Sequence, residues 1–218
     1  MIKLLLAVIL AFFLLGSCAK STSGEVEIYN NDFESGTLSG LTNGIVSSYN
    51  GGKVLGFYNN SQVVLSISDL PEHALVDISF DLYIHDNWDG NSQIQDNITG
   101  PDIWGMKVDN KTYINTTFSN NDCTPGYFCP PQSYPSEYPN FNHNPKSGAS
   151  KTDLPGVCSK AGNPNGSTLY KIHKSISHSE KALLLQFQDK LIQKDVDDPK
   201  CDESWSIDNI KIKVINLK

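Results

Sequence analysis

The chain contains no arginine, and all 17 of its Lys and Arg positions are lysines. Arginine is the side chain that most often binds phosphate and guanine through two parallel hydrogen bonds. The formal net charge is −7, and an acidic surface repels a phosphate backbone. The composition therefore argues against nucleic acid as a partner and leaves neutral or cationic partners open.

The sequence signatures of several enzyme classes are also missing. The five histidines form no HExxH or HxH pattern, so a zinc hydrolase has no support. No GxSxG nucleophile motif and no P-loop occurs. A pair such as Asp86 and Glu203 has the chemistry for glycoside hydrolysis, which needs two carboxylates about 5–5.5 Å or about 6.5–9.5 Å apart, but no spacing selects such a pair. We therefore expect a non-catalytic protein, with a glycan-active hydrolase as the weaker alternative.

Long apolar runs are scarce, and the only one lies at the start of the chain. Lys3 gives a positive beginning, and the apolar run 4–15 is too short to span a bilayer. The stretch LGSC, which ends at Cys18, resembles a bacterial lipobox, and this resemblance implies cleavage before Cys18 and lipidation of its sulfur. Ordinary signal cleavage after Ala19 is the alternative. We expect a signal peptide over residues 1–17 and an exported protein on the outer membrane or cell surface, held there by lipid alone, or else secreted.

Cysteine is sparse, but its number is informative. Four cysteines remain after Cys18, an even number in an oxidising compartment, which predicts two disulfides. Three pairings are possible. In one of them the first two cysteines close the short loop CTPGYFC and the last two tie a loop to the final strand. A zinc site of four cysteines is the rival interpretation, but no CxxC spacing supports it. The four residues are Cys123, Cys129, Cys158 and Cys201.

Removal of the signal peptide leaves about 200 residues, enough for one domain with a substantial core. Residues 18–25 are polar and predict a tether, and residues 26–218 then form a single domain. Its clearest element is LVDISFDLYIHD, in which apolar and polar residues alternate with the period of a half-buried strand. Hairpin turns are expected at Asn59-Asn60 and at Asp109-Asn110.

The rest of the domain follows the same β pattern, with one long exception. Residues 182–188 predict another strand, with a helix over 180–194 as the alternative. Residues 119–166 form an irregular insertion that holds three of the four cysteines. In the last strand the apolar residues change parity, which predicts a β-bulge near Asp208-Asn209. Many short strands and almost no helix predict an all-β fold, an antiparallel β-sandwich of the jelly-roll type with a long disulfide-tied loop.

Two stretches at the ends of the domain resemble a known group. NNDFESG near the start and WSIDNIKIKV at the end are similar to the ends of calcium-containing jelly-roll modules, including the galactose-binding-like sandwiches among carbohydrate-binding modules. The resemblance implies a structural calcium ion bound by Asp32, Glu34 and Asp208. Calcium takes six to eight oxygen ligands at about 2.3–2.6 Å, which adjacent first and last strands can supply. The alternative is that Asp32 and Asp208 only cap turns.

Every tryptophan of the chain lies beside carboxylates, in the stretches HDNWDGN, GPDIW and CDESW. Acidic residues gathered from three strand ends repel one another unless a metal or a hydroxyl-rich ligand satisfies them. Carboxylates that bind sugar hydroxyls beside a stacked indole are one use of this pairing. In the alternative, the indoles fill the core and the acids are solvated loop residues. The candidate ligand-binding residues are Asp86, Trp88, Asp89, Asp102, Trp104 and Glu203.

The sequence therefore predicts an exported, calcium-stabilised β-sandwich lipoprotein that binds a ligand, with a glycan as the main hypothesis. A structural or adhesive surface protein, whose long loop contacts another protein, is the second hypothesis.

Overall fold

The computed structural model describes residues 22–92, 100–193 and 197–217. The predicted signal peptide and the predicted lipidation site at Cys18 lie outside these residues. Residues 22–25, which we expected in the tether, belong to the first strand. No helix in the described ranges is long and apolar enough to cross a membrane.

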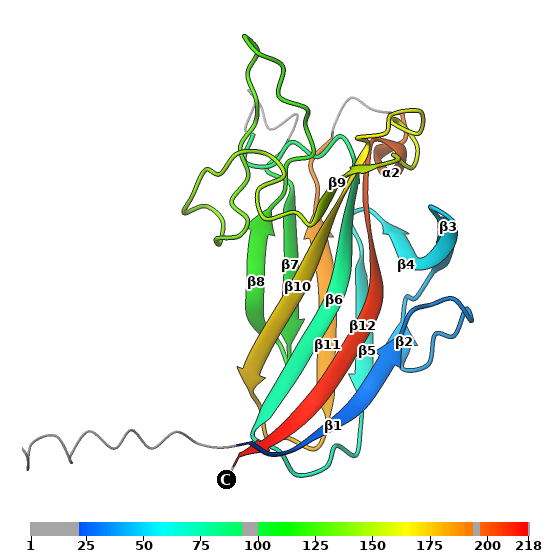
Figure 1. Ribbon diagram of the computed structural model, residues 1–218, viewed down its shortest axis with the longest axis vertical. Coiled ribbons are helices and arrows are strands. Elements are labelled where there is room, and N and C mark those ends of the chain that lie inside the picture. The colour runs from blue at the N-terminus through cyan, green and yellow to red at the C-terminus, as the bar shows by residue number, and fades with distance from the viewer. Residues whose placement is uncertain (1–21, 93–99, 194–196, 218) are drawn as a thin grey trace, which may run out of the picture.

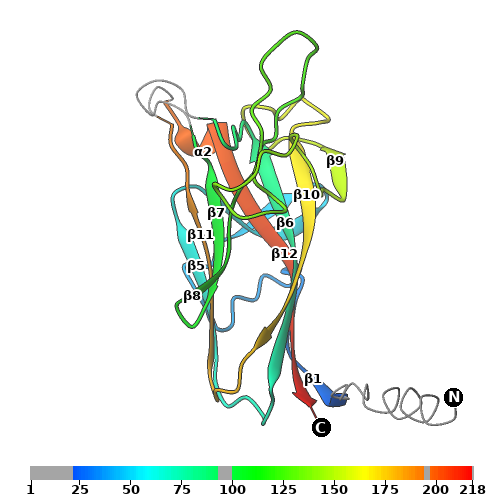
Figure 2. The same ribbon diagram turned by 90° about the vertical axis from the view of Figure 1, so that its left-hand side faces the viewer.

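Two antiparallel sheets pack face to face, as Figures 1 and 2 show. In the first sheet the order is β3-β4-β12-β6-β10-β9, and β1 also pairs with β12. Its strands are β1 (Thr22–Asn31), β3 (Val46–Tyr49), β4 (Gly52–Tyr58), β6 (Leu75–Asp86), β9 (Lys151–Leu154), β10 (Ser167–Ser177) and β12 (Glu203–Leu217). The all-β antiparallel sandwich predicted from the sequence is confirmed.

The second sheet has the order β2-β5-β11-β7-β8. Its strands are β2 (Leu41–Thr42), β5 (Gln62–Ile67), β7 (Ile103–Val108), β8 (Lys111–Thr117) and β11 (Leu183–Lys190). A short helix, α2 (Pro199–Asp202), precedes β12. The connections gather at the two ends of the sandwich, and the long irregular segments lie at the end opposite the C-terminus (Figure 1). We call the end with these segments the loop end and the other the terminal end.

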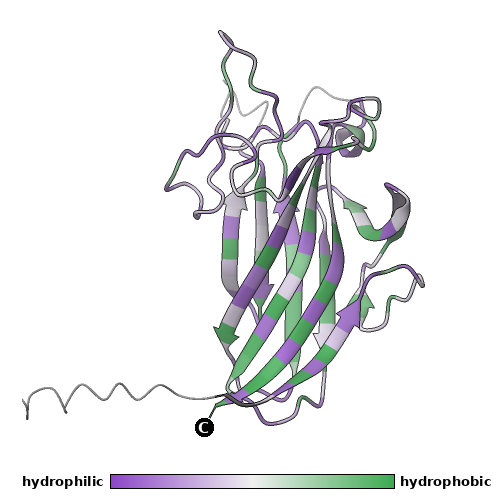
Figure 3. Ribbon diagram, in the orientation of Figure 1, coloured by the Kyte–Doolittle hydropathy of each residue, from purple (hydrophilic) through white to green (hydrophobic). Residues whose placement is uncertain are grey.

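Alternation along the central strand β6 builds the core. The five apolar residues at even positions from Val76 to Ile84 are all buried, and polar residues or a tyrosine separate them. Figure 3 shows the same alternation of apolar and polar residues along β10 and β12. The register of β12 against β6 shifts between Asp208 and Lys211, and Asn209 has a φ of 51°. The bulge predicted near Asp208-Asn209 is therefore confirmed.

Of the two expected hairpins, one is confirmed and one is wrong. Strands β7 and β8 pair across Asp109-Asn110, where both residues have positive φ, as a two-residue hairpin of this sequence requires. Strands β4 and β5, on either side of Asn59-Asn60, lie in different sheets. The backbone N–H groups of Asn60 and Ser61 donate to the carboxylate of Asp189 on β11, and this contact fixes the crossing between sheets.

The two predicted disulfides are present, and the zinc alternative is excluded. Cys123 pairs with Cys129 and Cys158 pairs with Cys201. The second bridge joins the segment after β9 to helix α2 and so ties the irregular region to the start of the last strand.

Candidate functional site

The acidic residues that flank the tryptophans do meet at the loop end. Asp102 precedes β7 in one sheet and Glu203 begins β12 in the other. Side chains two residues apart on a strand share a face, and the indoles of Trp104 and Trp205 contact each other with centroids 6.0 Å apart. Asp102 and Glu203 therefore face each other above this indole pair, between the sheets.

The acid pair, as we call Asp102 and Glu203, is fully buried. One oxygen of Asp102 accepts from the Asp89 N–H, and one oxygen of Glu203 accepts from the Gln193 side chain. The other oxygens, Asp102 Oδ1 and Glu203 Oε2, have no hydrogen-bond partner among the described residues. Burial, together with the charge of Asp102, raises the pKa of Glu203 to about 11, and burial raises the pKa of Asp102 well above its usual range. Both carboxyls thus favour the protonated form.

The tryptophans that we expected to meet a ligand belong to the core. Trp88 and Trp104 have no exposed surface, so neither indole can stack on a sugar in this structure, and that part of the prediction is corrected. The Trp88 indole N–H donates to the Ser204 carbonyl. Trp104 packs against Phe80, Phe118 and Phe187 as well as Trp205. Each tryptophan lies beside acids because it fills the last core layer below the loops, where the strands end.

Asp86 has a separate role from the acid pair. It is buried with a φ of 66°, and its carboxylate accepts the backbone N–H groups of Val157, Cys158 and Lys160. Burial raises the pKa of Asp86, although these three donors oppose the effect. Asp86 therefore organises the loop that the Cys158 disulfide ties down.

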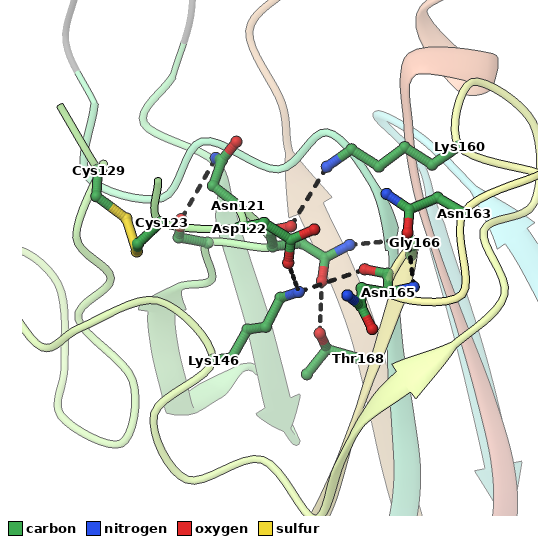
Figure 4. Close-up of polar contacts among 12 residues, drawn as sticks. Asn121, Asp122, Cys123, Cys129, Lys146, Lys160, Asn163, Asn165, Gly166 and Thr168 are labelled. Atoms are coloured by element: carbon green, nitrogen blue, oxygen red, sulfur yellow. Dashed lines mark hydrogen bonds and ion pairs between the residues drawn. A yellow bond between two sulfur atoms is a disulfide. The ribbon is translucent and has the colours of Figure 1, made fainter. Parts of the chain in front are cut away.

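Two lysines extend from separate loops into a polar cluster beside this loop (Figure 4). The Lys160 amine donates to the carbonyls of Asp86 and Asn120, and the Lys146 amine donates to Asp122 and to the Asn165 carbonyl. Burial, and next the charge of Lys146, lowers the pKa of Lys160. These contacts hold the irregular segment in place, because each amine links groups that are far apart in the chain.

Asp89 lies at the edge of the same region and is partly exposed. Its carboxylate accepts from the Asn121 side chain. Burial raises the pKa of Asp89, and the charge of Asp202 raises it further. Asp89 is the predicted ligand-binding acid that retains contact with solvent, whereas Asp86, Asp102 and Glu203 have none.

His85 lies on the face of β6 that points away from the core. Its ring nitrogens contact the hydroxyls of Ser167 and Ser206 at 2.8 Å each. Burial lowers the pKa of His85 to about 3, so the ring is neutral and a weak base. A serine paired with histidine is a feature of hydrolases, but all three residues are fully buried and no substrate reaches them in this structure.

The three predicted calcium ligands lie within electrostatic reach of one another. Burial raises the pKa of Asp208 to about 6, and the carboxylates of Asp81, Asp32 and Glu34 contribute. Their oxygens serve local contacts, however. Asp32 accepts from the Glu34 N–H, Glu34 from the Lys53 N–H, and Asp208 from the Asn209 N–H. In the described ranges no group of three His, Cys, Asp or Glu side chains is placed to hold a metal ion. The arrangement gathers charge but is not a formed coordination shell.

Calcium binding by these residues stays a prediction, and thermal unfolding tests it. Excess calcium is expected to raise the melting temperature by several degrees over the value in EDTA, because a ligand at 100 times its Kd adds about 2.7 kcal/mol. Asp208→Asn is expected to remove this difference, whereas the exposed Glu137→Gln is expected to keep it. Equal melting temperatures of the wild type in calcium and in EDTA would contradict the prediction.

A pocket that the sequence did not indicate lies where the chain crosses between the two sheets, beside the ends of β4 and β11 and the start of β5. Its volume is about 500 Å³, within the range of roughly 300–1,000 Å³ for small-molecule sites. We call it the amide pocket, because four side-chain amides and no lysine line it among the described residues. Its lining residues are Asn43, Ile45, Tyr58, Asn60, Ser61, Gln62, Gln188 and Asp189.

The polar groups of the amide pocket are held by defined contacts. The Tyr58 hydroxyl donates to the Asn43 carbonyl and accepts from the Ile45 N–H, which fixes one rim. Asp189 binds the backbone of the other rim through Asn60 and Ser61, and burial raises its pKa. These residues come from strands in both sheets, so only knowledge of the strand order could have brought them together.

A second exposed feature is the disulfide-closed loop CTPGYFC. Tyr127 and Phe128 in this loop are 78% and 77% exposed. The loop projects from the loop end of the sandwich (Figure 1). We call this pair of side chains the aromatic tip.

Comparisons with known proteins give the following results. No protein-family model matches the chain. No curated protein matches it either. Among solved structures, the chain is similar to a cycloisomaltooligosaccharide glucanotransferase of Paenibacillus sp., with a TM-score of 0.32 and 12% identity over 86% of this chain and 18% of the other.

A second similar structure is a family GH115 4-O-methyl-alpha-glucuronidase with specificity for decorated arabinogalactans. Its TM-score is 0.36, with 9% identity over 90% of this chain and 18% of the other. The chain thus spans less than a fifth of the length of either protein. At these identities the likeness carries no functional assignment.

Proposed function

We propose that this protein is an exported, non-catalytic β-sandwich lipoprotein that binds a neutral glycan in the amide pocket. The observation that carries the proposal is the pocket's lining of four amides, one carboxylate and two hydroxyls, with no lysine among the described residues that line it. Each sugar hydroxyl both donates and accepts a hydrogen bond, and side-chain amides and carboxylates match both needs. The two disulfides support export, because such bridges persist in oxidising compartments.

The pocket keeps donors and acceptors available for a ligand. In the described contacts Gln62 and Gln188 use their side-chain oxygens to accept from Gln186, so their amide nitrogens remain to donate. Asn43 donates through its amide nitrogen to the Gln62 carbonyl, so its side-chain oxygen remains to accept. Asp189 adds a carboxylate with further lone pairs.

The burial of the acid pair supports a non-catalytic role. A general acid must lie within hydrogen-bond reach of its substrate, and neither member of the acid pair has exposed surface. Asp189 is the one carboxylate that lines the amide pocket, whereas glycoside hydrolysis uses two.

Binding of neutral oligosaccharides to the full exported protein tests the proposal. A glycan array identifies a ligand, and calorimetry then measures its affinity for variants of the pocket. The double substitution Gln62→Ala with Gln188→Ala is expected to weaken binding roughly tenfold or more, because each lost hydrogen bond costs about 0.5–1.5 kcal/mol. The melting temperature is expected to stay near that of the wild type, since Gln62 is exposed and Gln188 is partly exposed.

The matched control replaces the aromatic tip, Tyr127→Ser with Phe128→Ser, at a distant part of the surface. This variant is expected to bind glycan as the wild type does. The opposite pattern, in which the tip substitutions abolish binding and the pocket substitutions do not, would reject the pocket. It would favour the second candidate, an adhesive protein that uses its exposed aromatic residues.

A further inference from the structure

A row of hydrogen-bonded polar groups joins three turns at the terminal end of the sandwich. His73 lies between β5 and β6, His178 between β10 and β11, and Asp109 between β7 and β8. His73 Nδ1 is 2.6 Å from the Pro71 carbonyl, and His73 Nε2 is 2.7 Å from His178 Nδ1. His178 Nε2 is 2.9 Å from Asp109 Oδ2. The two imidazole rings are nearly parallel, at 13°.

The outer contacts of this row determine where protons must lie. A carbonyl oxygen only accepts, so His73 Nδ1 carries a proton and donates to Pro71. An ionised carboxylate also only accepts, so His178 Nε2 carries a proton and donates to Asp109. If both rings were neutral, His73 Nε2 and His178 Nδ1 would then meet with two lone pairs 2.7 Å apart. One additional proton between these nitrogens turns the repulsion into a hydrogen bond.

The same count holds if the proton moves along the row. In this arrangement a protonated Asp109 donates to His178 Nε2, and His178 Nδ1 donates to His73 Nε2. The row again contains one proton more than two neutral histidines and an ionised aspartate would hold. The distance excludes a metal ion as the bridging cation. Two bonds from zinc to nitrogen are each about 2.0–2.1 Å, and a tetrahedral angle between them separates the nitrogens by more than the 2.7 Å seen here.

We propose that His73 and His178 share one proton, balanced by Asp109, and that this histidine latch couples the two sheets in a pH-dependent way. The two histidines lie in turns that connect one sheet to the other, and Asp109 lies in the β7–β8 turn of the second sheet. Backbone hydrogen bonds join the same turns. The Ala74 carbonyl accepts from the His178 N–H, and the Ala74 N–H donates to the Ile215 carbonyl on β12. The Leu184 N–H on β11 donates to Asp109 Oδ1. The latch therefore lies beside the last strand.

Asp109 offsets the cost of burying an extra proton on this pair. His73 and the His178 side chain are 6% and 5% exposed, and Asp109 is the charged side chain that contacts the pair within the described residues. The flanking charged residues Glu72, Glu180 and Lys181 are solvent-exposed. In the unfolded chain histidine loses its proton near pH 6.5, so above this pH folding must take up one proton.

The sign of the pH effect follows from this uptake. Stability from the shared proton is greatest near pH 6.5, where the two unfolded histidines together hold about one proton, and it declines as the pH rises. The unfolding equilibrium constant is expected to increase by up to about tenfold per pH unit until the folded protein also loses the proton. Below about pH 6.5 the unfolded chain binds a second proton, whereas a second proton on the folded pair would place two N–H groups against each other, so stability also declines as the pH falls.

Chemical unfolding of the oxidised protein between pH 6 and 9 tests the latch. In the wild type the latch is expected to raise the unfolding equilibrium constant by up to about tenfold per pH unit. His178→Gln and His73→Gln are each expected to remove this contribution. His173→Gln is the matched control, because His173 contacts Asp77 at 2.7 Å but its side chain is 63% exposed. This control is expected to keep the wild-type dependence. The acid pair is present in all of these proteins, so the difference between them isolates the histidines.

Nitrogen NMR of the wild-type imidazoles gives a readout that does not depend on variant folding. At pH 7.5 the two rings are expected to hold three protons on four nitrogens, with one proton common to His73 and His178. Two neutral rings beside an ionised Asp109 at that pH would overturn the proposal, as would a spectrum that changes when a chelator removes bound metal. Equal pH dependence of the wild type and both latch variants would also overturn it.

Discussion

Trp104→Ala is expected to lower the free energy of unfolding by about 4 kcal/mol, within the 3–5 kcal/mol typical of large aromatic residues truncated in a core. The indole has no exposed surface and lies at the centre of an aromatic cluster. Its ring centroid is 5.9 Å from that of Phe80 and 6.0 Å from those of Phe187 and Trp205. Neither sheet can close over the void alone, because these neighbours come from both of them.

Urea unfolding of the oxidised protein measures this loss. Tyr127→Ala is the matched control, since it removes an aromatic side chain that is 78% exposed, and it is expected to change stability by less than about 0.5 kcal/mol. The folded fraction of the Trp104 variant is expected to bind glycan normally. A loss of binding without a loss of stability would instead return Trp104 to the ligand site.

The sequence predicted features that depend on local pattern. Alternation marked β6 as a half-buried strand, a change of parity located the bulge at Asp208-Asn209, and an even cysteine count predicted two disulfides. Each of these features is encoded within a few neighbouring residues or by simple counting. For that reason they did not require knowledge of which strands are neighbours.

Features that depend on the opposite sheet were not predictable in this way. A strand shows a period of two whichever sheet it joins, so Asn59-Asn60 was mistaken for a hairpin turn. The segment instead crosses between the sheets, and its backbone N–H groups donate to the Asp189 carboxylate in the second sheet. The tryptophans were placed beside a ligand because their sequence neighbours are acidic. Their burial is decided instead by residues from distant strands, such as Phe187 against Trp104. The amide pocket combines residues near 43–62 with 188 and 189, and no local signal connects them.

Glu203→Gln is expected to raise the free energy of unfolding at pH 7 by about 2–3 kcal/mol. The folded protein keeps Glu203 protonated, because burial and the charge of Asp102 raise its pKa to about 11 from an ordinary value of 4.5. The unfolded glutamate ionises above 4.5, so stability is complete below that pH and declines by about 1.4 kcal/mol per unit as the pH rises toward the folded-state value. At pH 7 roughly 3 kcal/mol has been lost, and a neutral amide avoids this loss.

The geometry of the acid pair favours the same substitution. The carbonyl of the introduced amide can accept the Gln193 hydrogen bond that Glu203 now accepts. Its NH₂ group can donate to Asp102 Oδ1, which lacks a partner among the described residues. A buried polar atom without a hydrogen-bond partner costs about 1–3 kcal/mol, so the new contact adds to the electrostatic gain.

Unfolding measured from pH 5 to 8 distinguishes this account from an ionised, paired carboxylate. The Glu203 variant is expected to show a flatter dependence on pH than the wild type by up to one proton, whereas Glu72→Gln, at an exposed position, is expected to keep the wild-type slope. A variant that is less stable than the wild type at pH 7, with an unchanged slope, would show that Glu203 is ionised and paired with a cation. The acid pair lies directly above the Trp104–Trp205 contact. A higher free energy of unfolding in the Glu203 variant would therefore mean that the loop end of the core contains two carboxyls that destabilise the fold. Residues that lower stability in this way are common at sites shaped by function.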